Sequence, residues 1–352
     1  MEELKKLLQL LIDKNASDLH LIVGYPPTLR IDGEIASIIE SPVLTHEAIS
    51  GLLRTIMTAD QLERFTANKE LDFSLAFSDR ARFRANVYTQ KNSWAASFRG
   101  IPLEIPTIDS LGLPAILHRF ATLKQGFVLV TGPTGHGKST TLAATLDEIN
   151  QTRNAHIITI EDPIEFIFKK KTAIVSQREM GHDSHSWSVA LRSVLREDPD
   201  IVLVGEMRDY ETIASALTIA ETGHLVFATL HTNSAAQSID RIVDVFPNEQ
   251  QDQVKLQLSN VLESVFSQRL VPQQNGGRVV SYETLIATTA IRTAVREGKT
   301  HQIDSIIQTS SETGMNTMEA SLASLVTEGK ITFETAKNYS IRPEQLSRLL
   351  HQ

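Results

Sequence analysis

The sequence contains no cysteine among its 352 residues. Disulfide bonds, zinc sites with thiolate ligands and catalytic cysteine nucleophiles are therefore excluded. Long apolar runs are also missing, since no stretch approaches the roughly 18 consecutive apolar residues of a membrane-spanning helix. The sequence also has no concentrated basic segment, since the net charge is −8 and lysine and arginine are scattered along the chain. Because capture of a nucleic-acid backbone needs a basic surface, we expect no nucleic-acid partner.

The first residues, MEELKKLLQLLIDK, do not resemble a secretory signal. Such a signal begins with basic residues and ends at a cleavage site of small residues, whereas this segment begins with two glutamates. The spacing of its leucines predicts an amphipathic helix. We therefore expect a protein that works in the cytoplasm.

The length favours two or three domains, and the pattern changes twice along the chain. Residues 1–101 combine strand-like runs, such as PTLRIDGEI, DFSLAF and ARFRANVYT, with helical patterns near 45–67, which predicts a small α+β domain. Residues 102–114 are rich in proline and predict an extended linker. Residues 115–352 alternate strand and helix patterns, which predicts an α/β domain whose last part, after about residue 285, is helical.

Five apolar runs predict the strands of the second domain. Continuous runs of valine, isoleucine and leucine are typical of a parallel sheet that is covered on both faces. These runs are Phe127–Thr131, His156–Ile160, Ile201–Val204, Leu225–Leu230 and Arg278–Glu283.

A glycine-rich loop follows the first of these strands. Its sequence, GPTGHGKS, matches the pattern GxxxxGK[ST] at every fixed position. The glycines let successive backbone N–H groups point into one concavity, Lys138 brings a positive charge to the terminal phosphates, and Ser139 offers a hydroxyl to Mg²⁺. We predict a nucleoside triphosphate site formed by Gly132, Pro133, Thr134, Gly135, His136, Gly137, Lys138, Ser139 and Thr140.

His136 is the unusual residue of this loop. Inner loop positions contribute backbone donors, so we interpret His136 as a tolerated residue whose side chain points outward. A contact with a neighbouring subunit and a response to pH are the alternatives.

Carboxylates follow two of the predicted strands. HIITIEDPIEF contains Glu161, Asp162 and Glu165, and DIVLVGEMRD contains Glu206. Groups at the carboxyl ends of parallel strands face the same crevice as the P-loop, where they can hold Mg²⁺ through water or orient the attacking water. Gly205 occupies the place where many P-loop enzymes have an aspartate, so Glu206 is expected to take that role, alone or together with Glu161 and Asp162. Solvated acids at strand ends are the alternative reading.

Two histidines bracket the strand HLVFATLHT. His224 and His231 lie about 23 Å apart along a straight strand, which is too far for one shared metal ion. We expect His231, at the carboxyl end, to sense the γ-phosphate, whereas His224 is equally well explained as a packed residue at the start of the strand.

Arginines of the first domain are candidates for a catalytic role. Arg82 and Arg84 lie on one face of a predicted strand, and Arg99 lies near the linker. Guanidinium groups can neutralise charge that develops on a γ-phosphate, although arginines also protect exposed strand edges. Because these residues lie in a different predicted domain from the P-loop, domain closure or a neighbouring subunit must deliver them. We therefore expect an oligomer.

Many ordered blocks of the chain resemble the retraction ATPases of type IV pili, in the secretion-ATPase superfamily. They run from SDLHL and RFRAN through GPTGHGKSTT, TIEDPIEF, LREDPDIVLVGEMRD and TGHLVFATLHTNSA to AIRTAVRE at 290–297, which is similar to the retraction signature. The resemblance implies a homohexameric ring of subunits with a PAS-like N-terminal domain and a RecA-like ATPase domain, and with ATP between them. It also implies pilin extraction through an inner-membrane platform protein, and therefore a position at the cytoplasmic side of that membrane.

The resemblance assigns roles to the candidate residues. Lys138 and Ser139 correspond to the Walker A motif, Glu206 to the Walker B acid, and His224 and His231 to the His box. The remaining assignments are Glu161, Asp162 and Glu165 to the Asp box, and Arg82, Arg84 and Arg99 to the N-terminal arginines that serve the nucleotide.

Four alternatives remain at this stage. An assembly ATPase of pili or type II secretion usually has a four-cysteine insert, which this chain lacks. An accessory retraction ATPase is a closer competitor. A nucleic-acid translocase conflicts with the acidic composition, and a regulatory nucleotide binder without turnover conflicts with the presence of Glu206 and the Asp-box acids.

Overall fold

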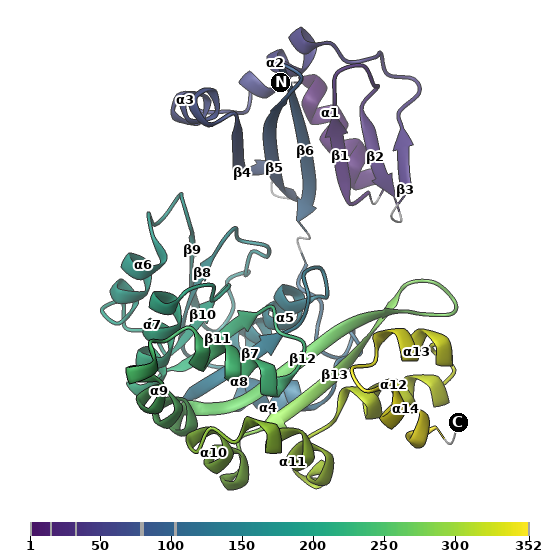
Figure 1. The fold of residues 1–352 in the computed structure, drawn as a ribbon. Coiled ribbons are helices and arrows are strands. Elements are labelled where there is room, and N and C mark those ends of the chain that lie inside the picture. The colour runs from purple at the N-terminus through teal and green to yellow at the C-terminus, as the bar shows by residue number, and fades with distance from the viewer. Residues whose placement is uncertain (1, 15, 32–33, 78–80, 102–103, 351–352) are drawn as a thin grey trace. The chain divides into compact units, whose positions relative to one another are not determined.

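The computed structural model describes residues 2–14, 16–31, 34–77, 81–101 and 104–350. They form two compact units (Figure 1). The smaller unit contains residues 1–104 and 165–167, and the larger contains residues 105–164 and 168–352. The boundary lies inside the expected linker, of which residues 102–103 fall outside the described part.

The smaller unit is a twisted antiparallel sheet with three helices. Among the described residues, six strands pair in the order β3-β2-β1-β6-β5-β4. The elements are α1 (Glu2–Asp13), β1 (Asp18–Leu21), β2 (Thr28–Ile31), β3 (Glu34–Ser37), α2 (His46–Arg54), α3 (Ala59–Asn68), β4 (Glu70–Phe77), β5 (Ala81–Gln90) and β6 (Ser93–Ile101).

The core of this unit follows from two sequence periods. Leucines of α1 recur at helical spacing and are buried, as are alternate residues of β5. Phe83 is therefore fully buried, while Arg82 and Arg84 lie on the other face of β5. This confirms the amphipathic first helix and the predicted sides of the arginine-bearing strand.

The larger unit is an α/β domain followed by a helical region. Its elements are α4 (Ile116–Thr122), β7 (Gly126–Thr131), α5 (Lys138–Thr152), β8 (His156–Glu161), β9 (Ile174–Glu179), α6 (Trp187–Val194), β10 (Ile201–Val204), α7 (Tyr210–Glu221), β11 (Leu225–Leu230), α8 (Ala235–Asp244), α9 (Asn248–Val261), β12 (Leu262–Pro272), β13 (Arg278–Ile286), α10 (Thr289–Arg296), α11 (Ile303–Thr309), α12 (Met318–Thr327), α13 (Phe333–Tyr339) and α14 (Pro343–Leu349).

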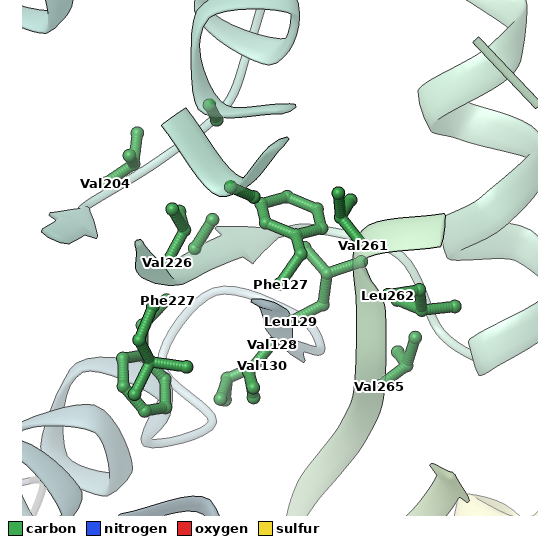
Figure 2. Packing of buried hydrophobic residues seen from close by; sticks show 14 of the residues in the cluster. Phe127, Val128, Leu129, Val130, Val204, Val226, Phe227, Val261, Leu262 and Val265 are labelled. Atoms are coloured by element: carbon green, nitrogen blue, oxygen red, sulfur yellow. The ribbon is translucent and has the colours of Figure 1, made fainter. Parts of the chain in front are cut away.

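The sheet of this unit is mainly parallel. In the described residues seven strands pair in the order β13-β12-β7-β11-β10-β8-β9, and only β12 with β13 is antiparallel. Every residue of β7, β10 and β11 is buried, so both faces of the sheet are covered. Figure 2 shows this packing around Phe127, Leu129 and Phe227. The five predicted strands are all present.

Two strands of this sheet were not expected from the sequence, β9 and β12. The expected linker also differs from the structure, because residues 105–114 group with the larger unit. Ile108 and Leu113 of this segment are buried in the core of that unit. Apolar side chains between the prolines thus fix the segment to the domain that follows it.

The C-terminal helices form a small core of their own. Met318, Leu322 and Leu346 pack with Val271 of β12, beside the end of the sheet (yellow in Figure 1). Within the described part of the chain, no helix is both long enough and apolar enough to cross a membrane.

Candidate nucleotide-binding site

The glycine-rich loop connects β7 to α5, as the sequence predicts. Gly132, Gly135 and Gly137 all have positive φ angles, 141°, 79° and 85°. A Cβ atom at Gly132 would lie 2.3 Å from the carbonyl oxygen of Gln268, so no other residue fits there. Gly137 caps the start of α5, whose first N–H groups and dipole favour an anion. The backbone therefore forms a phosphate cradle.

Lys138 lies at the base of this cradle and is 8% exposed. Its Nζ donates to the carbonyl oxygens of Gly132 and Pro133, at 2.8 and 3.0 Å. His231 Nδ1 lies 3.5 Å from the same nitrogen. The ammonium is thus held against the backbone of the loop, where it can exchange these carbonyls for phosphate oxygens.

His231 connects the loop to Glu206. Its Nδ1 is 3.2 Å from the Thr134 hydroxyl, and its Nε2 is 3.0 Å from Glu206 Oε1. Glu206 also accepts a hydrogen bond of 2.7 Å from Arg208. These contacts join the carboxyl ends of β7, β11 and β10, which are neighbours in the sheet. The prediction that strand ends bring these groups to the P-loop is therefore met for Glu206 and His231.

Glu206 is held as a carboxylate. Burial alone raises its pKa, but the hydrogen bond from Arg208, the neighbouring His231 and the positive charges of Arg208 and Lys138 outweigh burial, and the pKa lies below its ordinary value. The pKa of Arg208 is raised in return by its hydrogen bond to Glu206, and further by the charge of Asp162. An ionised carboxylate at this position can hold a water molecule by hydrogen bonding.

Gly205 has a steric reason to be glycine. A Cβ atom there would lie 3.1 Å from the Ile160 carbonyl oxygen and 3.2 Å from the Glu161 Cα. The side chain of an aspartate would have to enter this contact between β10 and β8. The acid of this segment stands one position later, at Glu206.

The Asp-box acids occupy different places. Glu161 ends β8, which β11 and β10 separate from β7, and its Oε1 accepts a 2.6 Å hydrogen bond from Thr159. Asp162 lines a cavity of about 500 Å³ together with Trp187 and Asp209. Glu165 groups with the smaller unit. Glu161 and Asp162 thus lie at the same carboxyl end of the parallel strands as the P-loop. Their chemical roles stay predictions.

His136 does not point outward, contrary to the sequence-based interpretation. Its Nδ1 accepts a hydrogen bond from the backbone N–H of Leu270 at 3.0 Å, and its carbonyl oxygen accepts one from Gln268 Nε2 at 2.7 Å. Both partners belong to β12, a strand that was not predicted. The side chain is therefore part of the contact between the loop and the sheet.

His224 lies at the opposite end of β11 from His231. Its Nδ1 is 3.0 Å from the Thr222 hydroxyl and 3.1 Å from the Ile219 carbonyl oxygen, at the end of α7. The structure does not bring His224 to the P-loop of the same chain. It closes the turn between α7 and β11.

The three arginines belong to the smaller unit. Arg99 lies within β6 and not in a linker, and its Nε donates to the buried Asp18 at 2.8 Å. Arg84 Nε lies 3.7 Å from Asp72 Oδ1. Arg82 shares the face of Arg84 on β5. Their proposed action on a nucleotide stays a prediction.

The residues of the loop fit a magnesium nucleotide. Ser139 is half-buried in the first turn of α5, directly after Lys138. Among the described residues, no group of three or more His, Cys, Asp or Glu could hold a metal ion. A Mg²⁺ ion bound together with the nucleotide would be held by the Ser139 hydroxyl, by phosphate oxygens and, through water, by Glu206.

Sequence reasoning missed two residues of the site. Arg208 was not considered, although its position two residues after Glu206 is a usable signal for an ion pair. Gln268 had no signal in the sequence, because its contact depends on the pairing of β12 with β7.

The comparisons with known proteins agree with this geometry. A family model described as Type II/IV secretion system protein matches residues 1–338. The type IV pilus retraction ATPase PilT of Pseudomonas aeruginosa is 49% identical over 342 residues, which cover 97% of this chain and 99% of that protein. The type IV pilus ATPase PilU of the same species is 39% identical over 338 residues, which cover 95% of this chain and 87% of PilU.

A solved structure is similar along the whole length. The crystal structure of the pilus retraction motor PilT with bound ADP matches with a TM-score of 0.92 and 47% identity, and covers 98% of both chains. The fold class predicted from the sequence, a RecA-like α/β ATPase domain with a smaller PAS-like α+β domain, is thereby confirmed.

Proposed function

The chain belongs to the Type II/IV secretion system protein family, and from this we propose that it is an ATP-hydrolysing motor that powers type IV pilus retraction. The observation that carries the proposal is the P-loop with Lys138 at its base, joined through His231 to the ionised Glu206. Such a site binds and cleaves a nucleoside triphosphate. The similarity to a retraction motor with bound ADP supports an adenine nucleotide as the ligand and pilus retraction as the mechanical work.

The roles of the residues follow from their chemistry. Backbone N–H groups of the P-loop and the Lys138 ammonium bind the phosphates, and Ser139 completes the site for Mg²⁺, which neutralises charge on the phosphate oxygens when it is bound. Glu206 orients a water molecule toward the γ-phosphate. His231 reports the presence of that phosphate, because it contacts both the loop and Glu206.

The working form proposed here is a ring of six copies. A motor needs a second body to move against, and the arginines of the smaller unit, including Arg84, need to be brought to a nucleotide. We place the ring in the cytoplasm at the base of the pilus, bound to an inner-membrane platform protein through which pilin subunits are withdrawn. Nucleic acid is not a partner in this proposal, because the chain is acidic.

An accessory retraction ATPase is the second candidate. The identity to PilU is 39%, against 49% for PilT, which favours the main motor. An assembly ATPase is disfavoured, because such ATPases usually have a four-cysteine insert and this sequence contains no cysteine.

The pili of a strain that lacks the gene show whether the motor retracts pili or assembles them. Retraction predicts long, immobile pili and loss of twitching, whereas an assembly role predicts bald cells. Normal pili that still retract would contradict the main proposal and favour an accessory role. Complementation with Lys138→Ala tests whether ATP drives the process: the variant is expected to fail to restore twitching, although it is produced at normal levels.

A further inference from the structure

Strand β12 extends beyond the end of its neighbour β7. The pairing of the two strands ends at Ser267 with Thr131, while β12 continues to Pro272. Beyond Ser267, the edge of β12 that pairs with β7 contacts the P-loop instead. Backbone groups there need partners other than a strand, because an unpaired buried N–H group is costly.

His136 provides one of these partners. Its Nδ1 accepts the Leu270 N–H at 3.0 Å. Since a backbone N–H group can only donate, Nδ1 must be the unprotonated nitrogen, and the neutral ring carries its proton on Nε2. A second hydrogen bond holds the backbone of the same residue: Gln268 Nε2 donates to the His136 carbonyl oxygen at 2.7 Å.

Positive charges surround this imidazole from three elements. They are Lys138 of α5, Arg269 of β12 and Arg278, which begins β13. Burial lowers the pKa of His136, and these charges lower it further. Arg278 also donates to the Gly135 carbonyl oxygen at 3.3 Å. The surroundings therefore favour the neutral ring that the hydrogen bond requires.

We propose that His136 is a positioning residue of the P-loop, whose neutral imidazole ties the loop to β12 and so holds the glycines on either side of it in the phosphate-binding conformation. This inference rests on the proposed function, because it takes the loop to be the nucleotide site. When His136 gains a proton, Nδ1 becomes a donor and faces another donor. The tie is then lost and nucleotide affinity falls.

Two variants separate the hydrogen bond from the bulk of the side chain. His136→Asn keeps an acceptor oxygen near the position of Nδ1 but does not titrate, whereas His136→Leu fills the space without an acceptor. The measurement is the dissociation constant of N-methylanthraniloyl-ADP with Mg²⁺, from fluorescence titrations between about pH 8 and about pH 4.5, because the pKa of His136 lies below the ordinary histidine value.

The expected results differ for each protein. At about pH 8, His136→Leu binds the probe roughly five- to tenfold more weakly than wild type, the effect of one lost hydrogen bond, and His136→Asn recovers most of this loss. As the pH falls, the affinity of wild type falls more steeply than that of His136→Asn. Proton uptake by the nucleotide itself affects both proteins equally, so the ratio of their dissociation constants isolates the imidazole.

Two outcomes overturn the inference: equal affinities of the Asn and Leu variants at every pH, or a constant ratio between wild type and His136→Asn. Lys138→Ala tests the underlying assignment independently. If that variant binds the probe as tightly as wild type, the nucleotide site itself is wrong. If it does not bind, the results for His136 concern the positioning role alone.

Discussion

Among single residues, His231 lies between the P-loop and Glu206 and contacts both. Nε2 faces Glu206, and Nδ1 faces Thr134 and Lys138. A neutral ring satisfies both sides, since Nε2 can donate to the carboxylate while Nδ1 accepts from the hydroxyl or the ammonium. The carboxylate proposed to orient water and the lysine proposed to bind phosphate therefore contact the same side chain.

Glu206→Gln is expected to separate binding from hydrolysis. The amide cannot provide the negative charge that orients and polarises water, so phosphate release should fall by two or more orders of magnitude, about 3 kcal/mol of barrier. The affinity for N-methylanthraniloyl-ADP should change little, because the P-loop is intact. Glu249→Gln, an exposed change in α9, is the matched control. Phosphate release by Glu206→Gln at the rate of this control would remove Glu206 from the mechanism.

The residues at strand ends could be predicted because topology alone places them. Lys138, Glu206 and His231 follow apolar runs, and parallel strands bring such positions to one edge. Arg208 and the orientation of His136 could not be predicted in this way. Both depend on which side chains meet across loops, and the contact of His136 involves a strand whose existence was not recognised.

At the scale of secondary-structure elements, Arg292 joins two helices. Its guanidinium donates to the carbonyl oxygens of Ser259 and Asn260 at the end of α9, and to Ala287 before α10. It also forms an ion pair of 2.8 Å with Glu263. The last carbonyls of a helix have no partner within the helix, so this arginine acts as their cap.

Arg292→Ala is therefore expected to destabilise the larger unit by about 2 kcal/mol, since it leaves several acceptors without a donor. Arg296→Ala is the matched control, because Arg296 lies one turn further along α10 and is exposed. Thermal melting followed by circular dichroism should show a lower midpoint for the first variant only. Equal midpoints would mean that water replaces the guanidinium without cost.

Strand β13 has a buried carboxyl group that makes stability depend on pH. Glu283 is 1% exposed, and burial raises its pKa to about 7, although the Ala235 N–H donates to it at 2.7 Å. In the unfolded chain the pKa is near the ordinary value of 4.5. Between these values the folded protein holds a proton that the unfolded chain has lost. This contribution to stability is complete below the unfolded pKa and is lost as the pH rises to about 7.

Glu283→Gln is expected to remove this dependence. The amide keeps an acceptor oxygen for Ala235 and cannot ionise, so the variant should gain stability over wild type as the pH rises from about 5 to about 8, by an amount on the order of 2–3 kcal/mol. Urea unfolding at several pH values measures the difference. The exposed Glu312→Gln serves as the control. Parallel pH profiles for Glu283→Gln and wild type would show that Glu283 ionises normally.

Three strands escaped prediction for identifiable reasons. Strand β12 begins directly after α9 without glycine or proline, and several of its buried residues are polar, among them Ser264, Ser267 and Gln268. Strand β6 follows a two-residue turn at Lys91 and Asn92, both with positive φ, which lacks the usual glycine. Strand β9 at the sheet edge is only partly buried, so its apolar pattern is weak.

At the scale of the whole molecule, catalysis is expected to depend on more than one copy. The P-loop belongs to the larger unit and the candidate arginines to the smaller one. Arg84 is only loosely paired with Asp72, at 3.7 Å, and both side chains are exposed by more than two fifths. Such an arginine can change partners at little cost.

Mixed assemblies test whether the arginines act between subunits. Arg84→Ala and Lys138→Ala should each lack activity alone, and a mixture should recover part of the phosphate release, since some neighbours then combine an intact loop with an intact arginine. A mixture of Arg84→Ala with the double variant is the control and should stay inactive. No recovery at any ratio would mean that each arginine serves the nucleotide of its own chain.

Strand β12 also links the P-loop to the C-terminal helices. Gln268 and Leu270 bond to the P-loop, while Arg269 between them donates to the Tyr339 carbonyl oxygen at the end of α13. Adjacent residues of β12 therefore contact the P-loop and the C-terminal helices, so a rearrangement of the loop during turnover can be transmitted to those helices through Arg269. We expect those helices to shift when the loop rearranges, so a protein bound to them would respond to hydrolysis without contacting ATP.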